Sequence, residues 1–333
     1  METDVTTVLG PVSADDLGRV LVHEHVRIRY PGEMLDPGSS SHRADCVARA
    51  VERLEAVAAH GVRTIVDPCP IELGRDPELM ADVSQRSGVH IVCSTGFYFE
   101  HDAIGIPFYW RARSAEEVAE FYLHEIDHGI DDTGIRPGVV KIASGDPPGP
   151  HDRKVIAGAA IAARESHIPI VSHCEHSKGG NVQQDILAEH GADLTRAVIG
   201  HQDEEADPAK LVAIAERGSF VGIDRVGTVL APESQRADNV ATLVDGGFAD
   251  RICLAHDATC CFHAPRFPYP LAEDTPPTFA AEIHPVFTEQ MMRPYTHLFE
   301  NFLPMLHDRG IGDETVDRIL IDNPRRLLAG APA

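Results

Sequence analysis

The chain has 333 residues, of which 43% are hydrophobic and 24% are charged, and its formal net charge is −23. No apolar run reaches the roughly 18–20 residues of a membrane span, and the acidic start of the chain lacks the basic and apolar regions of a signal peptide. The negative charge argues against a nucleic-acid surface, which needs clustered Lys and Arg. It also disfavours highly anionic substrates, although a local field can override the global one.

Seven cysteines form neither a CxxC pair nor a zinc-finger spacing. Cys93, Cys174 and Cys253 lie in apolar, strand-like runs, which indicates buried thiols in a reducing compartment. We therefore expect a cytoplasmic protein. The adjacent Cys260 and Cys261 receive no role, and greater exposure stays open for them.

Eight short runs rich in β-branched residues recur along the chain, each about as long as a typical strand. Most are almost continuously apolar, which is typical of strands covered on both faces. The runs are Val20–Val26, Thr64–Asp67, His90–Tyr98, Val139–Ser144, Ile168–Glu175, Ala197–Asp203, Phe220–Asp224 and Ile252–Ala258.

Segments with apolar residues at helical spacing separate these runs. They include Asp45–His60, Lys154–His167, Asn181–His190, Pro208–Arg217 and Arg236–Gly246. The alternation predicts an α/β fold, a (β/α)8 TIM barrel that forms a single domain over residues 1–333. An open doubly wound sheet is the alternative, and it loses support because no strand precedes a nucleotide-binding glycine motif.

The first run carries His23 and His25, whose side chains point the same way on a strand, about 6.6 Å apart. Two neutral imidazoles on one side of a strand can share a metal ion. The pattern is a weak signal by itself, because a polar turn after a strand looks the same.

Further polar residues mark later runs, near the strand ends where a barrel carries its active site. Lys141 lies in the fourth run, His173 and His201 follow the apolar parts of the fifth and sixth, and Asp257 follows that of the eighth. Each alone has an ordinary explanation in a loop or cap. However, Lys141 is flanked by apolar residues and is costly to bury unless it is paired or chemically altered.

Together the six groups predict a metal centre. Imidazole and carboxylate suit zinc, manganese, iron or cobalt. Six groups are too many for one four-coordinate catalytic zinc with an open position, and they suit two metals about 3.5–4 Å apart. A cationic lysine cannot bridge two cations, whereas a carbamylated lysine is a carboxylate and can.

These motifs resemble the phosphotriesterase family of the amidohydrolase superfamily over nearly the whole chain. The matching segments are His23-Glu24-His25, Gly138-Val139-Val140-Lys141-Ile142-Ala143, Val171-Ser172-His173, Ile199-Gly200-His201-Gln202-Asp203, Leu254-Ala255-His256-Asp257 and Ile321-Asp322-Asn323-Pro324.

The resemblance implies a hydrolase with two divalent metal ions. His23, His25 and Asp257 would hold the more buried ion, and His173 and His201 the more exposed one. Carbamylated Lys141 and a hydroxide would bridge them. Zinc is the expected metal, and the same ligands accept manganese, iron or cobalt.

Two further motifs resemble the lactonase branch of that family. Tyr98, in Thr95-Gly96-Phe97-Tyr98, would lie near the hydroxide and help to hold developing negative charge. Asp224-Arg225-Val226-Gly227 is similar to the Asp-Arg-aromatic-Gly of that branch, with Val226 in place of the aromatic residue. Arg225 would engage a carbonyl or carboxylate.

The last ligand, Asp257, follows Ala255-His256, where Ser-His is common in the family. By resemblance, Asp257 would also accept the proton of the attacking hydroxide. It would then pass that proton towards His256 or His201.

The connection after Asp257, residues 258–294, exceeds the ~12–15 residues usual for loops without secondary structure. It holds seven prolines and five Phe or Tyr residues. Because it follows the eighth strand, we interpret it as a substrate lid that lines the pocket with apolar surface. A stiff surface cover is the alternative.

The resulting hypothesis is a lactonase that opens neutral lactones, acyl-homoserine lactones among them. The enzymatic alternatives are an organophosphate triesterase (aryldialkylphosphatase) and a carboxylic ester or amide hydrolase. A mononuclear nucleobase deaminase fits less well, because it does not need Lys141. A metal-retaining binding protein is the non-enzyme alternative, which the complete ligand set disfavours. Family resemblance implies a homodimer.

Overall fold

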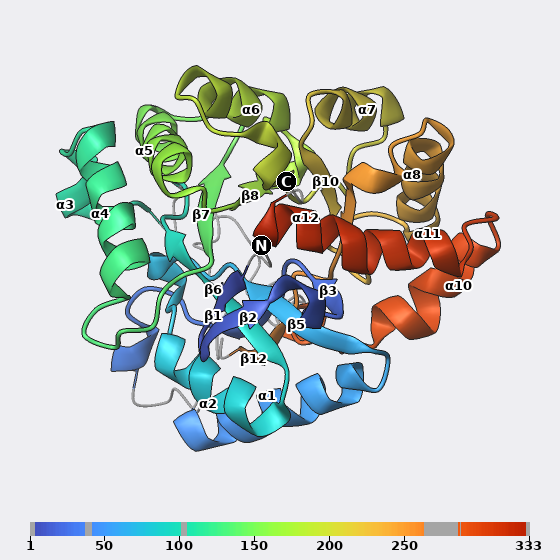
Figure 1. The fold of residues 1–333 in the computed structure, drawn as a ribbon, viewed down its shortest axis with the longest axis horizontal. Helices are drawn as coiled ribbons and strands as arrows, with labels where there is room; N and C mark the ends of the chain where they lie inside the picture. Colours follow the sequence, from blue (N-terminus) through green and yellow to red (C-terminus); the bar gives the residue numbers. More distant parts are fainter. Residues whose placement is uncertain (1–3, 37–41, 101–104, 263–285, 287, 331–333) are drawn as a thin grey trace, which may run out of the picture.

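The computed structural model describes residues 4–36, 42–100, 105–262, 286 and 288–330. Eight parallel strands form one sheet in the order β11-β10-β9-β8-β7-β6-β5-β3, and helices surround it (Figure 1). The predicted (β/α)8 barrel is therefore confirmed. Its strands are β3 (Arg19–Leu21), β5 (Val62–Asp67), β6 (His90–Gly96), β7 (Val139–Ser144), β8 (Ile170–Cys174), β9 (Ala197–Ile199), β10 (Phe220–Ile223) and β11 (Ile252–Leu254).

The barrel closes at a seam between its first and last strands. The predicted strand Val20–Val26 is wrong as one element, because it breaks after β3 and resumes as β4 (His25–Ile28). The predicted strand Ile252–Ala258 likewise breaks after β11, and β12 (Thr259–Phe262) follows. β4 and β12 pair in parallel, and the Asp257 N–H donates to the His23 carbonyl at 2.9 Å. The two breaks thus lie side by side at one end of the barrel.

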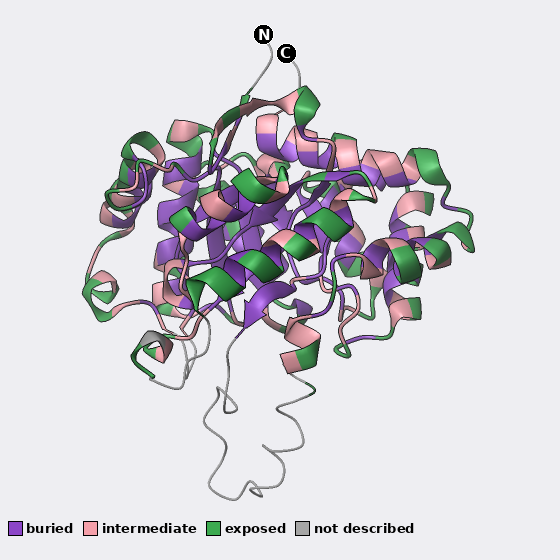
Figure 2. Cartoon of the chain, turned by 90° about the horizontal axis from the view of Figure 1, so that it is seen from below, coloured by how far each residue is buried: buried purple, intermediate pink, exposed green. Residues whose placement is uncertain are grey.

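Amphipathic helices cover the outside of the barrel, with their apolar sides on the strands and their outer sides exposed (Figure 2). Helix α5 (Pro150–Ser166) packs between α4 (Ala115–His128) and α6 (Gly180–Glu189). Apart from short 3-10 helices, the other helices with bounds in the described residues are α1 (Arg43–Ala58), α2 (Pro77–Ser87), α3 (Phe108–Arg111), α7 (Pro208–Glu216), α8 (Glu233–Asp245), η7 (Leu298–Phe302), α10 (Leu303–His307), α11 (Asp313–Asp317), η8 (Arg318–Asp322) and α12 (Asn323–Ala329).

Side chains fill the amino-terminal half of the barrel. One buried cluster takes a residue from each of the eight strands: Val20, Val66, Val92, Val139, Val171, Val198, Phe220 and Cys253. The hairpin of β1 (Asp4–Thr7) and β2 (Gly10–Ser13) lies at this end together with α12 (Figure 1). A filled barrel leaves only its carboxyl end open for a site, as this fold requires.

All seven cysteines are free and buried, including Cys260 and Cys261, for which greater exposure had stayed open. Among the described residues, no helix combines the length and apolar character needed to cross a membrane.

Candidate metal centre and active site

The predicted metal ligands converge at the carboxyl end of the barrel. The ligand atoms of His23, His25 and Asp257 lie within 4.8 Å of one another. Asp257 Oδ1 is 3.6 Å from His23 Nε2 and 3.3 Å from His25 Nε2, and Asp257 Oδ2 is 3.7 Å from His201 Nε2. Lys141 Nζ lies 3.2 Å from His23 Nε2. Five of the six predicted ligands therefore form one buried cluster.

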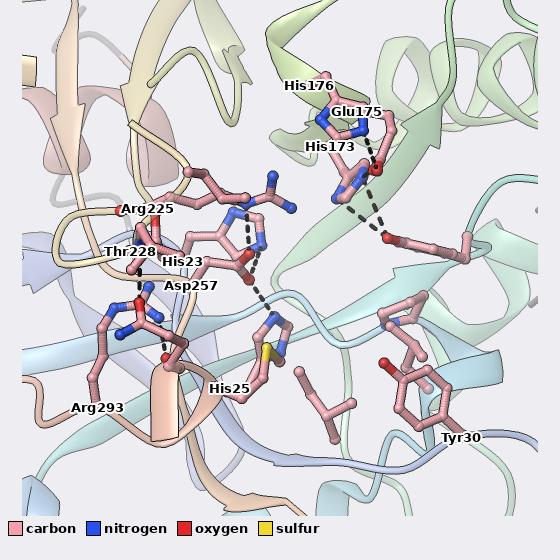
Figure 3. A pocket seen from close by; sticks show the side chains of 18 of the residues that line it. His23, His25, Tyr30, His173, Glu175, His176, Arg225, Thr228, Asp257 and Arg293 are labelled. Atoms are coloured by element: carbon pink, nitrogen blue, oxygen red, sulfur yellow. Dashed lines mark hydrogen bonds and ion pairs between the residues drawn. The ribbon is translucent and has the colours of Figure 1, made fainter. Parts of the chain in front are cut away.

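The sixth, His173, lies beside this cluster at the end of β8. Its ring meets the ring of His201 edge-on, with 4.4 Å between centroids. His173 Nε2 is hydrogen-bonded to Glu175 Oε2 at 2.7 Å, and the Tyr98 hydroxyl lies 3.3 Å from the same nitrogen. Figure 3 shows His173 and Glu175 across the cavity from His23, His25 and Asp257.

Two carboxylates that sequence reasoning did not assign orient the imidazoles. Asp224 accepts from Nδ1 of His23 at 2.9 Å and from Nδ1 of His201 at 2.8 Å, one with each oxygen. Asp67 lies 3.1 Å from Nδ1 of His25. A carboxylate on one ring nitrogen fixes the tautomer and aims the other nitrogen outward. Both aspartates occur at the ends of predicted strands, and that position was the available signal.

Two of the candidate ligands have left-handed backbone conformations. His201 has φ 56° and Asp257 has φ 52°. Non-glycine residues are uncommon in this region, and such strain concentrates at functional sites. For Asp257 the turn accompanies the break between β11 and β12, which directs its carboxylate towards His23 and His25.

Burial sets the protonation of the cluster. It lowers the pKa of His23, lowers that of His201 well below the usual value, and lowers that of His173 to about 4. These three imidazoles are therefore neutral near pH 7, which is the form that binds metals. Burial also lowers the pKa of Lys141 to about 8, so that neutral amine, the form that reacts with CO2, is available.

Asp257 and His25 behave as an ion pair. Burial opposes ionisation of Asp257, yet His201, His25 and His23 hold its pKa well below the usual value. Burial also opposes a charge on His25, but its hydrogen bonds to Asp257 and Asp67 raise its pKa well above the usual value. A metal bound at His25 would therefore displace a proton.

The donor set fits two divalent cations. His201 Nε2 is buried, and no described residue is a hydrogen-bond partner for it. The only partner of Lys141 Nζ among the described residues is an imidazole, so a buried amine here has no counter-ion at hydrogen-bond distance. An unpaired imidazole nitrogen and an uncompensated lysine are both accounted for if cations and a carbamate occupy this space.

Two further residues lie next to Asp257: Arg225 contacts its carboxylate, and His256 precedes it in the sequence. Arg225 reaches the cavity and His256 does not. Arg225 faces the cavity, and its Nε donates to Asp257 Oδ2 at 3.0 Å. His256 is fully buried: its Nδ1 lies 2.5 Å from Glu24 Oε1, and its Nε2 accepts the Leu298 N–H at 3.0 Å. Since both ring nitrogens are occupied, His256 has no place for a proton, and the proposed transfer to it is wrong.

A cavity of about 360 Å³ opens onto five of the candidate ligands and onto Arg225. The five ligands are His23, His25, Lys141, His173 and Asp257. Its polar end carries Asp257, Arg225, Tyr98 and Glu175, as Figure 3 shows in part. Its apolar wall includes Ile28, Tyr30, Leu73, Val229, Leu230 and Met291. Of the predicted lid 258–294, residues 263–285 and 287 lie outside the described residues. Its first part forms β12 rather than a loop, and Val286, Gln290, Met291 and Arg293 line the cavity.

The chain is similar to known proteins over almost its whole length. A sequence model of the phosphotriesterase family matches residues 3–328. A "phosphotriesterase homology protein" of Mycobacterium tuberculosis is 35% identical, covering 98% of this chain and 97% of that protein. An aryldialkylphosphatase of Saccharolobus solfataricus is 32% identical, with 96% and 97% covered. An N-acetyltaurine hydrolase of Mus musculus is 28% identical, with 97% of each covered.

Solved structures agree. A triple mutant of an organophosphorus hydrolase from Deinococcus radiodurans superposes with a TM-score of 0.86 at 32% identity, covering 98% of each chain. A protein engineered for organophosphate hydrolysis from a weak promiscuous lactonase template superposes with a TM-score of 0.85 at 32% identity, with 98% and 99% covered.

Proposed function

The chain belongs to the phosphotriesterase family of metal-dependent ester hydrolases, and from this premise we propose that it is a lactonase acting on neutral acyl lactones, including acyl-homoserine lactones. One observation carries the proposal: an apolar cavity wall leads directly to a cluster of metal-ligating side chains. The wall would hold an acyl chain, and the cluster would lie at the lactone carbonyl.

In this proposal His23, His25 and Asp257 would hold one metal ion and His173 and His201 the other, with carbamylated Lys141 as a ligand of both. When bound, the two cations would acidify a shared water and polarise the substrate carbonyl. Zinc is the metal we expect, because imidazole nitrogens and carboxylate oxygens, which make up this ligand set, are among its usual ligands.

Asp257 would act as the base. Its carboxylate is ionised, faces the cavity and is held by Arg225 through Oδ2. It would take the proton of the attacking water and deliver it to the ring oxygen that leaves as the C–O bond breaks. His256 is excluded as the next acceptor. His201, whose Nε2 lies 3.7 Å from Asp257 Oδ2, and the cavity side of the carboxylate are the remaining routes for the proton.

Tyr98 and Arg225 would position the carbonyl. Both line the cavity, and both lie within hydrogen-bonding distance of candidate ligands, Tyr98 of His173 and Arg225 of Asp257. A hydroxyl and a guanidinium aimed at the reacting oxygen stabilise the charge that develops there.

The same cluster supports two other reactions. Hydrolysis of a neutral phosphotriester uses the same water and carbonyl-binding groups, and it is named for the Saccharolobus and Deinococcus proteins. Hydrolysis of an amide is named for the mouse protein. The extended apolar wall favours the acyl lactone among these.

We also propose a cytoplasmic homodimer. Seven free, buried thiols fit a reducing compartment. The exposed Phe108 and Tyr109 of α3 offer an apolar surface for a second copy.

The decisive experiment assays the zinc-loaded protein, with and without chelator, on a panel of lactones, phosphotriesters, aryl esters and N-acyl amides. We expect chelator-sensitive turnover with the highest kcat/KM for an acyl lactone. A higher value for a phosphotriester or amide would replace the lactone proposal, and no turnover of any substrate would favour a binding protein.

Metal content tests the bridge independently of substrate. Lys141→Ala should lose bound metal, because no carbamate can form, and reconstitution of the wild-type protein should improve with added bicarbonate. Two metals per chain in Lys141→Ala would contradict the bridging role.

A further inference from the structure

Arg293 lies in the wall of the cavity, near Thr228 (Figure 3), and only 7% of it is exposed. Two of its three guanidinium nitrogens donate to backbone carbonyls. Nε donates to Val226 at 2.8 Å, and Nη1 donates to Gln290. The third nitrogen, Nη2, is buried and has no hydrogen-bond partner among the residues that the structure describes. One face of a buried cation is therefore left without an acceptor.

Its charge is also left without a counter-ion. Among the described residues, no carboxylate forms an ion pair with Arg293. By contrast Arg225 is 3.0 Å from Asp257, and the fully buried Arg236 is 2.9 Å from Asp203. Burial lowers the pKa of Arg293 to about 10, which leaves it charged near pH 7. Asp257 and Glu24 attract this charge from beyond ion-pair distance, but its direct partners among the described residues are two carbonyls. A buried charge with such partners is costly and is a mark of functional sites.

The backbone makes room for this side chain. Gly227 has φ +86°, and a Cβ there would lie 3.0 Å from Arg293 Cδ and 2.9 Å from the His297 ring. A glycine in the left-handed region thus accommodates the arginine stem beside the turn that carries Arg225. Two backbone carbonyls and the space beside Gly227 therefore fix where the Arg293 side chain lies.

We propose that Arg293 binds a negatively charged oxygen of the substrate, so that the preferred substrate carries a carboxylate in addition to the bond that is hydrolysed. A guanidinium matches a carboxylate in geometry and charge. A water molecule would supply an acceptor for Nη2 but no charge. Because Arg293 lines the same cavity as Asp257, the carboxylate and the scissile bond belong to one small molecule. The inference rests on the proposed hydrolase function and revises its substrate class, from neutral acyl lactones to lactones or esters that also carry a carboxylate.

The test compares two esters of equal chain length that differ by one charge: para-nitrophenyl valerate and the mono-para-nitrophenyl ester of glutaric acid. The wild-type zinc-loaded enzyme should prefer the charged ester. Arg293→Met should lower kcat/KM for it by roughly 10- to 100-fold, mainly through KM, because a charge-assisted hydrogen bond is lost. Loss of the two carbonyl bonds of Arg293 would affect both esters alike, so the decisive quantity is the ratio of kcat/KM for the charged ester to kcat/KM for the valerate, which should fall by roughly 10- to 100-fold in Arg293→Met.

Arg196→Met is the matched control. Arg196 also donates to two backbone carbonyls, those of Leu327 and Leu328, but it lies where η5 (Leu194–Arg196) meets α12, at the closed end of the barrel. It should leave the preference between the two esters unchanged. Arg293→Lys keeps the positive charge but lacks the paired N–H donors of the guanidinium, so it should retain part of the preference for the charged ester. It replaces Arg293→Met in the test if that variant does not fold.

Equal losses on both esters in Arg293→Met, or a wild-type preference for the valerate, would overturn the inference. Glutarate binding to the zinc-loaded proteins, measured by calorimetry, separates this failure from failure of the proposed function. Binding at least tenfold tighter to the wild type than to Arg293→Met supports the carboxylate site even if no ester is hydrolysed. Equal binding refutes it even if lactones are.

Discussion

Asp224 is the residue on which the largest part of the candidate metal centre depends. It holds one imidazole from each of the two proposed metal sites, and its Oδ1 also accepts the His201 N–H at 2.7 Å. Asp224→Asn should therefore lower the metal affinity of both sites by roughly 10- to 100-fold, which is the usual effect of losing a residue that hydrogen-bonds a metal ligand. Competition with a zinc-binding dye would measure this.

Asp67→Asn is the comparison for that prediction. Asp67 contacts only His25 among the predicted ligands, so its loss should weaken one site and spare the other. If Asp224→Asn also affects only one of two metal-binding steps, the dual role assigned to Asp224 is wrong.

The ligand types were readable from the sequence, whereas their supports were not. The sequence points to four of the ligands because polar and charged residues are costly in apolar strand runs. These four are His23, His25, Lys141 and Asp257. The support from Asp224 and Glu24 could not be assigned in the same way, because Asp224 contacts His23 and Glu24 contacts His256 across more than 200 residues of chain. His256 shows the reverse case: it looked catalytic beside Asp257, but tertiary packing occupies both its nitrogens.

At the scale of elements, β6 lies against β7 at Gly96 without room for a side chain. This residue has φ +127°, and a Cβ there would lie 2.1 Å from the Lys141 carbonyl oxygen. Gly96→Ala should therefore push the two strands apart, lower the free energy of unfolding by about 3 kcal/mol or more, and displace Lys141. Urea unfolding of the metal-loaded protein would measure the loss.

Gly88→Ala is the control for that substitution. Gly88 also has a positive φ, of +71°, but its Cβ would meet nothing within 4 Å. It should cost only the left-handed strain of about 1–2 kcal/mol. Equal losses in the two variants would mean that contact with β7 is not the cause.

The short helix η3 (Ile71–Leu73) carries a pH-sensitive contact to the loop after β6. Glu72 Oε2 accepts the Tyr98 N–H at 3.0 Å, and burial raises the pKa of Glu72 to about 7. Between the unfolded value, near 4.5, and pH 7 the folded protein holds a proton that the unfolded chain has lost. Stability should therefore fall as pH rises through this window.

Glu72→Gln should remove that contribution. The variant should gain stability relative to the wild type at pH 8 and match it more closely at pH 5, as measured by urea unfolding at each pH. A difference that does not change with pH would exclude Glu72 as its source.

Element boundaries were harder to predict than element order. The apolar runs predicted eight strands in the right places, but the first and last break where their backbones change partner, at His23 and Asp257. Both breaks fall inside apolar runs without proline or glycine. Periodicity records which residues are buried, not which strand each backbone group meets.

At the scale of the whole molecule, the proposed ligands join distant parts of the barrel, from the β3–β4 break to the β11–β12 break. Removing the metals should lower the apparent stability, by about 4 kcal/mol when free metal had been a thousandfold above Kd. A lower melting temperature after chelation, restored by zinc, would be the observation. An unchanged melting temperature would mean that no metal ion links these two parts of the barrel.

The barrel as a whole was predictable because its rule is local: each strand is followed by a helix, and connections of this kind are right-handed. The cavity wall was less so. Its residues come from β4 and the chain just after it, from η3, from the connection between β10 and α8, and from the stretch before η7, and no periodic pattern joins them. Arg293 in particular lay in a stretch whose sequence suggested only a lid.

The seam where His23 meets Asp257 also sets an order in time. The two residues are joined by a backbone hydrogen bond across the closure of the barrel, yet more than two-thirds of the chain separates them. A ribosome delivers His23 first and Asp257 only after the first seven strands have emerged. Since contacts of such long range form late, the proposed metal site would be completed only after the eighth strand has emerged. Metal loading would then be a maturation step of the finished barrel, not a nucleus around which it folds.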